Sequence, residues 1–291
     1  MARSRQLVLF FALWLVFAIV FESAILNFGF KRLWVTALMW SVGAAAMLTL
    51  RLSGQPLTSL GWNWGPARYH LIAFLLPLIY GGTAYGGAAA AGLIQVAAPH
   101  STETLIQNQG LQSLAPTLGL AGALVLSSTV GMVGGMSNAL GEEIGWRGFL
   151  TPRLTAGLGF MVATLITGVI WACWHLPVLV LSDYNGGGDV RFEITSFVVM
   201  VLAISGVFAW LRLASGSLWP AATLHAAHNV FIQNVFDPLT TRGASQITMV
   251  SEFGVVTAAA CLIASIPFWI DGVRRFASDR STALTAHPPA S

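Results

Sequence analysis

The fold of this chain is decided by residues 118–153, which read LGLAGALVLSSTVGMVGGMSNALGEEIGWRGFLTPR. No charged side chain occurs in this stretch before Glu142, and a helix needs about 20 mostly apolar residues to cross the hydrocarbon core of a membrane. Glu142, Glu143 and Arg147 then follow in close succession. A charged side chain in mid-bilayer costs at least ~2.5–3.5 kcal/mol, so such residues are rare there and usually functional. The stretch therefore predicts a membrane helix that carries part of a site.

The rest of the chain has the same apolar character. Of its 291 residues, 56% are hydrophobic and 9% are charged, and the mean hydropathy is +0.74. Ordinary soluble chains carry roughly 25% charged residues, so a soluble, fibrous or disordered protein is excluded. Cys173 and Cys261 lie far apart in apolar runs, which excludes a disulfide framework. The net charge of +3 comes from scattered basic residues and indicates no nucleic-acid partner.

These runs predict an all-α polytopic membrane helix bundle with about eight transmembrane helices. We expect residues 1–273 to form one integral membrane domain, with a catalytic core over about 118–236, and residues 274–291 to form a polar, disordered tail. The predicted spans are 7–29, 33–50, 69–98, 118–153, 159–181, 194–214, 218–236 and 252–271.

The distribution of basic residues predicts an orientation in the membrane. Eight spans place both termini on one side, and an excess of arginine and lysine marks the cytoplasmic side. If the termini are cytoplasmic, most of the 14 basic residues fall on that side. They are Arg3, Arg5, Arg51, Arg68, Arg147, Arg153, Arg212, Arg274, Arg275 and Arg280.

Helical spacing separates the roles of the two adjacent glutamates. Glu143 and Arg147 are four residues apart, so their side chains face each other on a helix and can neutralise each other. Glu142 lies about 100° around the helix and cannot use Arg147 equally well. Glu143 and Arg147 are therefore expected either to order this helix or to form a structural ion pair, and Glu142 is left for chemistry.

Two further predicted spans carry polar residues. Trp171 and His175 share one helix face. A second helix is predicted to begin near Pro220 with Ser217 as its cap, and it places His225 and Asn229 one turn apart. Counting 1.5 Å per residue from the nearest predicted turns gives depths of roughly 21 Å for Glu142, 24 Å for His175, and 14 and 20 Å for His225 and Asn229. We therefore expect these four side chains to meet inside the membrane.

A buried carboxylate, two imidazoles and an amide are the groups needed to hydrolyse a bond with activated water. A glutamate among apolar side chains can act as general base, and a histidine can share the water or protonate a leaving amine. A second histidine and an asparagine can stabilise an oxyanion where little water competes. Cys173 lies on a different helix face from His175, so no covalent nucleophile is indicated.

Together these motifs resemble the CPBP family, which comprises type II CAAX prenyl endopeptidases and bacteriocin-processing or self-immunity proteins. The resemblance rests on the ordered motifs Glu142-Glu143-x-x-x-Arg147, Trp171-x-x-x-His175 and His225-x-x-x-Asn229, and it covers roughly residues 118–236. The family usually has phenylalanine where this chain has Trp171, a conservative change for a packing residue.

The resemblance implies an intramembrane endopeptidase in which Glu142 and His175 activate water, and His225 and Asn229 form the oxyanion site. It implies a protein or peptide substrate, possibly membrane-anchored, and a multi-pass protein of a bacterial plasma membrane. No cofactor is required on this interpretation. Zinc bound by Glu142, His175 and His225 is the alternative, since two histidines and a carboxylate with an open position are a known zinc arrangement.

Two other classes of protein remain open. Intramembrane carboxylates and histidines also form proton relays in transporters, but the chain lacks the repeats and paired broken helices of that class. The chain could also be a non-catalytic scaffold or immunity protein that binds a partner. The substrate, cleavage site and oligomeric state are not encoded in any motif that we find.

Overall fold

The computed structural model describes residues 3–96, 103, 105–106, 119–182, 184–240 and 248–277. This part of the chain is helical, and its only bridge between extended residues joins Val96 to Thr240. The prediction of an all-α membrane bundle is confirmed. The helices are α1 (Arg3–Phe28), α2 (Arg32–Leu52), η1 (Leu57–Leu60), α3 (Ala67–Ala90), α5 (Leu120–Glu143), η3 (Ile144–Leu150), α6 (Thr151–Leu181), α7 (Val190–Ser215), α8 (Trp219–Asn229), η4 (Val230–Phe236), η5 (Asp237–Leu239) and α10 (Val255–Arg275).

Six of the described helical stretches are long and apolar enough to cross a membrane, and one of them, Leu120–Leu181, doubles back on itself. The rings of Trp146 and Trp174 lie 5.9 Å apart, whereas 28 residues of straight helix would separate them by about 42 Å. The reversal occurs at Gly159, whose φ of 74° and ψ of 170° interrupt the helix. This is where the predicted span 118–153 gives way to the predicted span 159–181. Helix α8 has 11 residues and continues as the π-helical turn η4. The count of eight spans therefore stays a prediction.

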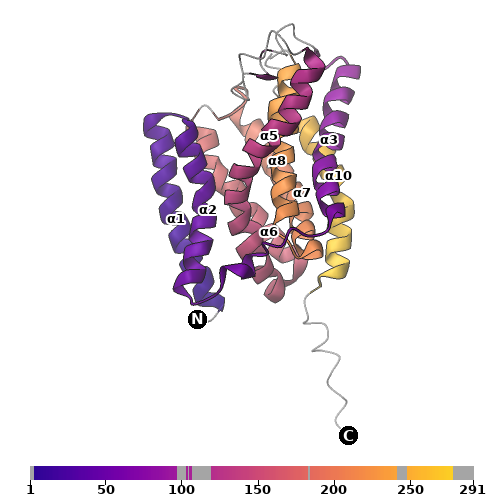
Figure 1. Ribbon diagram of the computed structural model, residues 1–291. Helices are drawn as coiled ribbons and strands as arrows, with labels where there is room; N and C mark the ends of the chain where they lie inside the picture. The colour runs from indigo at the N-terminus through magenta and orange to yellow at the C-terminus, as the bar shows by residue number, and fades with distance from the viewer. Residues whose placement is uncertain are drawn as a thin grey trace.

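Helix α8 occupies the centre of the bundle and is the helix around which the site is built. Every residue from Pro220 to His228 is buried, and the helix packs against α3, α5 and α7 (Figure 1). Small side chains permit this close approach, because association between membrane helices depends on tight packing. They are Ala221, Ala222, Ala226 and Ala227.

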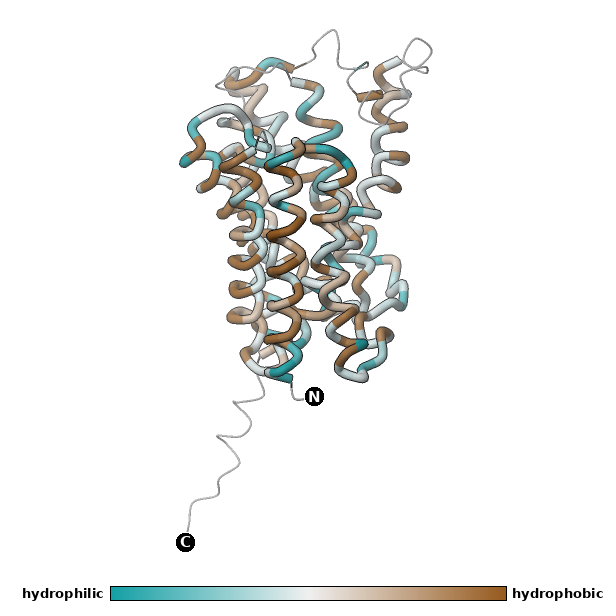
Figure 2. Tube along the Cα trace, turned by 90° about the vertical axis from the view of Figure 1, so that its left-hand side faces the viewer, coloured by the Kyte–Doolittle hydropathy of each residue, from teal (hydrophilic) through white to brown (hydrophobic). Residues whose placement is uncertain are grey.

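The periphery of the bundle presents apolar side chains outward, as a lipid-exposed surface requires. Helix α1 lies at one side of the bundle against α2 (Figure 1), and only 17% of the residues in its most apolar stretch are buried. Val8, Leu15 and Val16 on this helix are more than half exposed. In Figure 2 the chain trace is brown, the colour of hydrophobic residues, along much of the length of the helices. The protein is therefore an integral, multi-pass membrane protein.

Both ends of the described chain lie at one end of the bundle (Figure 1). The amide of Phe160, just after the reversal at Gly159, donates a 3.1 Å hydrogen bond to the carbonyl of Phe276 at the end of α10. The predicted common side for the termini is thus confirmed. Two predicted boundaries shift: α3 ends at Ala90 rather than 98, ahead of Gly92 with its φ of 71°, and α10 continues to Arg275. The remainder of the predicted tail, 278–291, and most of the predicted loop 99–117 lie outside the described residues.

Candidate active site

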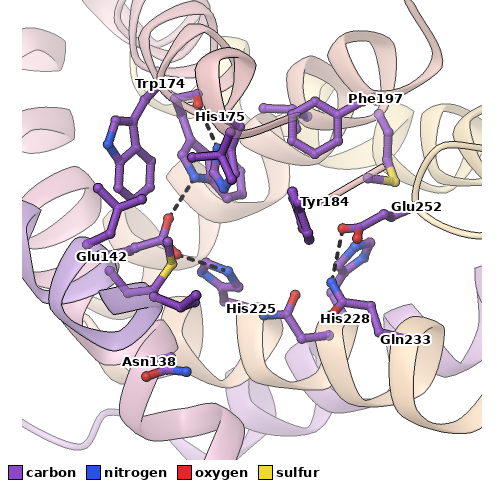
Figure 3. A pocket seen from close by; sticks show the side chains of 18 of the residues that line it. Asn138, Glu142, Trp174, His175, Tyr184, Phe197, His225, His228, Gln233 and Glu252 are labelled. Atoms are coloured by element: carbon purple, nitrogen blue, oxygen red, sulfur yellow. Dashed lines mark hydrogen bonds and ion pairs between the residues drawn. The ribbon is translucent and has the colours of Figure 1, made fainter. Parts of the chain in front are cut away.

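The structure brings the four polar side chains singled out in the sequence to one cavity. Glu142, His175, His225 and Asn229 all line a cavity of about 200 Å³. Figure 3 shows the first three of them around this cavity. Glu142 and His225 are buried, whereas His175 and Asn229 are partly exposed. The remaining wall is mainly apolar and comes from α1, α2, α6 and α7. Its apolar members include Ile25, Phe30, Val35, Leu38, Met39, Val178, Phe197, Met200, Ile204 and Phe208.

Glu142 reaches the cavity because α5 lies unusually close to α2. A Cβ atom added at Gly141 would lie 2.9 Å from the Cα of Trp40, and one added at Gly145 would lie 2.7 Å from the carbonyl oxygen of Val42. Only glycine fits at these two positions, and α5 passes into the π-helical turn η3 immediately after the glutamate pair. Such π-helical turns occur frequently at functional sites.

Both carboxylate oxygens of Glu142 face a polar partner. Oε2 accepts a 2.8 Å hydrogen bond from the indole nitrogen of Trp171. Oε1 lies 3.7 Å from Nε2 of His225. The carboxylate is thus fixed by one donor on α6 and faces an imidazole on α8, inside a cavity whose wall is mainly apolar. Hydrogen bonds to a charged group in such surroundings are among the stronger ones in proteins.

Glu143 connects Arg147 to His225. Its Oε1 accepts a 2.9 Å hydrogen bond from Nη1 of Arg147 and a 3.0 Å hydrogen bond from Nδ1 of His225. The guanidinium of Arg147 is 1% exposed and lies 4.4 Å from the ring centre of Trp171 and 4.0 Å from that of Phe208. Arg147 therefore pairs with Glu143, as the four-residue spacing predicts. The pair does more than order its own helix, because Glu143 also holds the imidazole of His225.

The hydrogen bonds of the two imidazoles determine which nitrogen faces the cavity. A carboxylate or carbonyl oxygen can only accept, so Nδ1 carries the proton in both residues. In His225 this proton goes to Glu143, and Nε2 faces Glu142. In His175 it goes to the backbone carbonyl of Trp171 at 3.0 Å. The Nε2 atom of His175 is left as an acceptor when the ring is neutral.

Helix α8 is fixed at its start and carries two more polar residues into the site. The N-cap of α8 is Leu218, which makes no side-chain capping hydrogen bond, so the predicted cap at Ser217 is wrong by one residue. The hydroxyl of Ser217 still accepts a 3.1 Å hydrogen bond from the amide of Trp219. Within the described residues, the side-chain amide of Asn229 makes no hydrogen bond, so it is free to meet a substrate in the cavity. His228 also lines the cavity, and its Nδ1 is hydrogen-bonded to the hydroxyl of Tyr80.

The structure changes the interpretation of one residue and adds others. Trp171 is more than a packing residue, because its indole donates to Glu142 and phenylalanine could not do so. Asn138, one helical turn before Glu142, also lines the cavity, and its spacing on α5 could have identified it. No sequence signal marks the remaining additions, which come from η4 and from connections between helices. They are Tyr184, Gln233 and Glu252.

The geometry offers no metal site in the described part of the chain. No three His, Cys, Asp or Glu side chains there are arranged to hold a metal ion. His225 donates to Glu143 from Nδ1 and His175 to the carbonyl of Trp171 from Nδ1, so these hydrogen bonds leave Nε2 of both rings toward the cavity. As the side chains are arranged they do not form a zinc site, and we derive no step through a metal.

Comparison with known proteins finds similarity over the part of the chain that forms this site. Residues 121–231 match the family described as "Type II CAAX prenyl endopeptidase Rce1-like". The chain is also similar to CAAX prenyl protease 2 of Methanococcus maripaludis, at 24% identity over 131 residues, which is 42% of this chain and 44% of that relative. The similarity thus spans less than half of the relative. The family match runs from α5 to the start of η4 and includes every motif residue of the cavity. Over these residues the membrane core is therefore similar to type II CAAX prenyl endopeptidases, and both matches support the resemblance to the CPBP family.

Proposed function

We propose that the protein is an intramembrane endopeptidase that hydrolyses a peptide bond with water activated by Glu142 and His175. The observation that carries this proposal is the placement of the Glu142 carboxylate. It is held by the indole of Trp171 in a cavity that also contains both imidazoles. A carboxylate with one oxygen fixed and little water around it is suited to take a proton from a bound water molecule.

The proposed reaction uses each side chain at the atom that the structure leaves available. Glu142 takes a proton from water, and the resulting hydroxide attacks the carbonyl carbon of the substrate. His175, through Nε2, shares the water and relays the proton that Glu142 removed to the leaving nitrogen as the C–N bond breaks. The products are a carboxylic acid and an amine, and Glu142 and His175 return to the carboxylate and the neutral imidazole.

His225 and Asn229 are the proposed oxyanion site. With Nδ1–H donated to Glu143, His225 can donate from Nε2 in its imidazolium form, and Asn229 donates from its side-chain amide. Donors aimed at a developing negative charge in a site with little water stabilise the transition state strongly. Glu143 and Arg147 are positioning residues in this scheme, because they orient His225 and do not touch the substrate.

The cavity leads toward the end of the bundle opposite the termini. Its lining includes Phe30 from the α1–α2 connection, Tyr184 from the α6–α7 connection and Glu252 from the connection before α10. Phe30 and Tyr184 stack with ring centres 5.4 Å apart. The positive-inside rule assigns the termini to the cytoplasm. We therefore propose that a polypeptide substrate reaches the site from the non-cytoplasmic face.

Hydrolysis without a tightly bound metal is part of the proposal. It is supported by the arrangement of Glu142, His175 and His225, which are not grouped as metal ligands in the described part of the chain. Cleavage should therefore persist after treatment of the purified protein with a chelator. Loss of cleavage on chelation, with recovery on adding zinc, would replace this scheme with a zinc-dependent one.

Peptide cleavage by the purified protein tests the function. Wild type, Glu142→Gln and His175→Ala are compared in detergent with a library of quenched fluorogenic peptides, with and without a lipid anchor. Removing a general base or acid should reduce turnover by about 10²–10⁴-fold. Glu22→Gln, which removes a carboxylate of α1 outside the cavity, should retain full activity. No cleavage by folded wild-type protein would reject the enzyme and favour a partner-binding scaffold.

A further inference from the structure

The cavity contains a second carboxylate that the proposed reaction does not use. Glu252 lies in the connection before α10, is 7% exposed and lines the same cavity as Glu142. In Figure 3, Glu252 lies across the cavity from Glu142, near His228 and Gln233. A buried carboxylate facing a substrate cavity is costly to maintain unless a partner compensates its charge.

The partners of Glu252 within the protein are neutral. Its Oε2 accepts a 3.0 Å hydrogen bond from Nε2 of Gln233, and it is also hydrogen-bonded to Tyr184. Among the described residues, no lysine or arginine forms an ion pair with it. Glu143, by contrast, is paired with Arg147. The negative charge at this end of the cavity is thus left without a cationic partner from the described chain.

A connected cluster of aromatic rings includes Tyr184, a hydrogen-bond partner of this carboxylate. The rings of Tyr184 and Phe253 lie 5.6 Å apart, and those of Phe197 and Phe253 lie 5.9 Å apart. Phe30 stacks on Tyr184 from the other side. Tyr184, Phe197 and Phe30 line the cavity. A carboxylate beside aromatic rings is the composition that binds lysine and arginine side chains, through charge and through cation–π attraction.

The ionisation of Glu252 is sensitive to what enters the cavity. The pKa of Glu252 is raised to about 7, mainly by burial and to a smaller extent by the nearby charge of Asp237. Hydrogen bonds with Tyr184 and Gln233, and the proximity of His225, act in the opposite direction. Near neutral pH the group is therefore poised between its two forms, and an entering cation would favour the carboxylate.

We propose that Glu252 binds a lysine or arginine side chain of the polypeptide substrate, close to the bond that is cleaved at Glu142. The proposal rests on the proposed function for the identity of the substrate as a polypeptide. Tyr184 and Gln233 hold the carboxylate in place, and the aromatic cluster accommodates the long alkyl part of the basic side chain. Glu252 is thus a specificity residue and takes no part in the proton transfers.

Binding and cleavage of paired peptides test this assignment. The two peptides of a pair differ at one position, which carries lysine in one and the neutral isostere norleucine in the other. The position is changed from pair to pair. Wild type should prefer the lysine form at one position by about tenfold in kcat/KM, mainly through KM, as expected for one ionic contact. Glu252→Gln should abolish the preference, so that the variant cleaves the lysine and norleucine peptides with equal kcat/KM. Glutamine at position 252 keeps an oxygen that can accept the hydrogen bond from Gln233. The variant Glu252→Asp keeps the charge and should retain part of the lysine preference.

A binding measurement keeps this test independent of turnover. In the Glu142→Gln background, the lysine peptide should bind about tenfold more tightly than the norleucine peptide, and adding Glu252→Gln should make the two equal. Asp271→Asn, which alters an exposed ion pair on α10, should leave the ratio unchanged. Equal binding of the two peptides at every position, or a preference that survives in Glu252→Gln, would overturn the assignment. Absence of cleavage with a retained lysine preference in binding would reject the proposed enzyme and keep the subsite.

Discussion

The indole nitrogen of Trp171 donates a 2.8 Å hydrogen bond to Oε2 of Glu142, across 29 residues of sequence and from one helical segment to the next. The same indole ring packs against the guanidinium of Arg147. One side chain therefore fixes the proposed base and also covers the cation that neutralises the adjacent glutamate. The residue that the family usually has at this position, phenylalanine, could provide only the second contact.

Replacing Trp171 by phenylalanine should separate these two contributions. The variant keeps an aromatic ring against Arg147 but loses the donor to Glu142. Because a hydrogen bond to a charged group contributes about 1.5–3 kcal/mol to folding, the variant should lose thermal stability. Because the base also loses the donor that fixes it, kcat should fall by about tenfold or more. Trp146→Phe is the matched control, since the buried indole nitrogen of Trp146 has no hydrogen-bond partner among the described residues. Equal turnover in the two variants would show that the hydrogen bond does not position the base.

The ion pair between Glu143 and Arg147 predicts a stability effect that depends on both partners. Glu143→Gln leaves the buried guanidinium without its carboxylate, and breaking a buried pair in this way costs about 3–5 kcal/mol. The double variant Glu143→Gln/Arg147→Met removes the stranded charge and should recover most of that loss. Thermal unfolding in detergent measures both effects. Cleavage should stay low in the double variant, because a neutral amide holds the His225 imidazolium less well than a carboxylate. The single variant Arg147→Met completes the comparison. If the stability lost in the double variant equals the sum of the losses in the two single variants, the two side chains do not stabilise the fold as a pair.

The lysine preference assigned to Glu252 should depend on pH. Its pKa is about 7, and only the carboxylate form binds a cation. Ionisation increases as the pH rises, so KM for a lysine peptide should fall by about fivefold between pH 6 and 8. The norleucine peptide should show no such fall, and Glu252→Gln should remove the difference between the peptides. Tyr184, Gln233, Asp237 and His225 also face this group. Titration of His225 would change kcat for both peptides alike. The comparison of the lysine peptide with the norleucine peptide therefore separates that effect from the ionisation of Glu252.

The proposed face of entry can be measured by cysteine accessibility. Val190, at the start of α7, is 39% exposed at the end of the bundle where the cavity leads, and Gln55 is exposed at the end with the termini. In a background with Cys173→Ala and Cys261→Ala, each position is replaced by cysteine in turn. A membrane-impermeant thiol reagent added to intact cells should label Val190→Cys and leave Gln55→Cys unmodified. The reverse pattern would place the entrance in the cytoplasm.

The membrane helices and the composition of the site follow from the sequence alone. A bilayer forces each crossing segment to satisfy its backbone hydrogen bonds internally, so runs of apolar residues identify the helices almost directly. Local helical geometry likewise determines that Arg147 pairs with Glu143 and that His175 shares a face with Trp171. These relationships need only 3.6 residues per turn and no knowledge of neighbouring helices.

Contacts between helices were decided only by the tertiary structure. The rotation and tilt of packed helices, which no local period encodes, determine that the indole of Trp171 meets Glu142 and that Glu143 meets His225. Glu252 shows the limit most clearly, because it lies in a connection with no motif, and only the packing of the α6–α7 connection and η4 around it brings its carboxylate to the cavity. The sequence thus determined which polar groups enter the membrane. The packing of the bundle determined how they face one another, because side-chain contacts across helices depend on distances that only the folded chain defines.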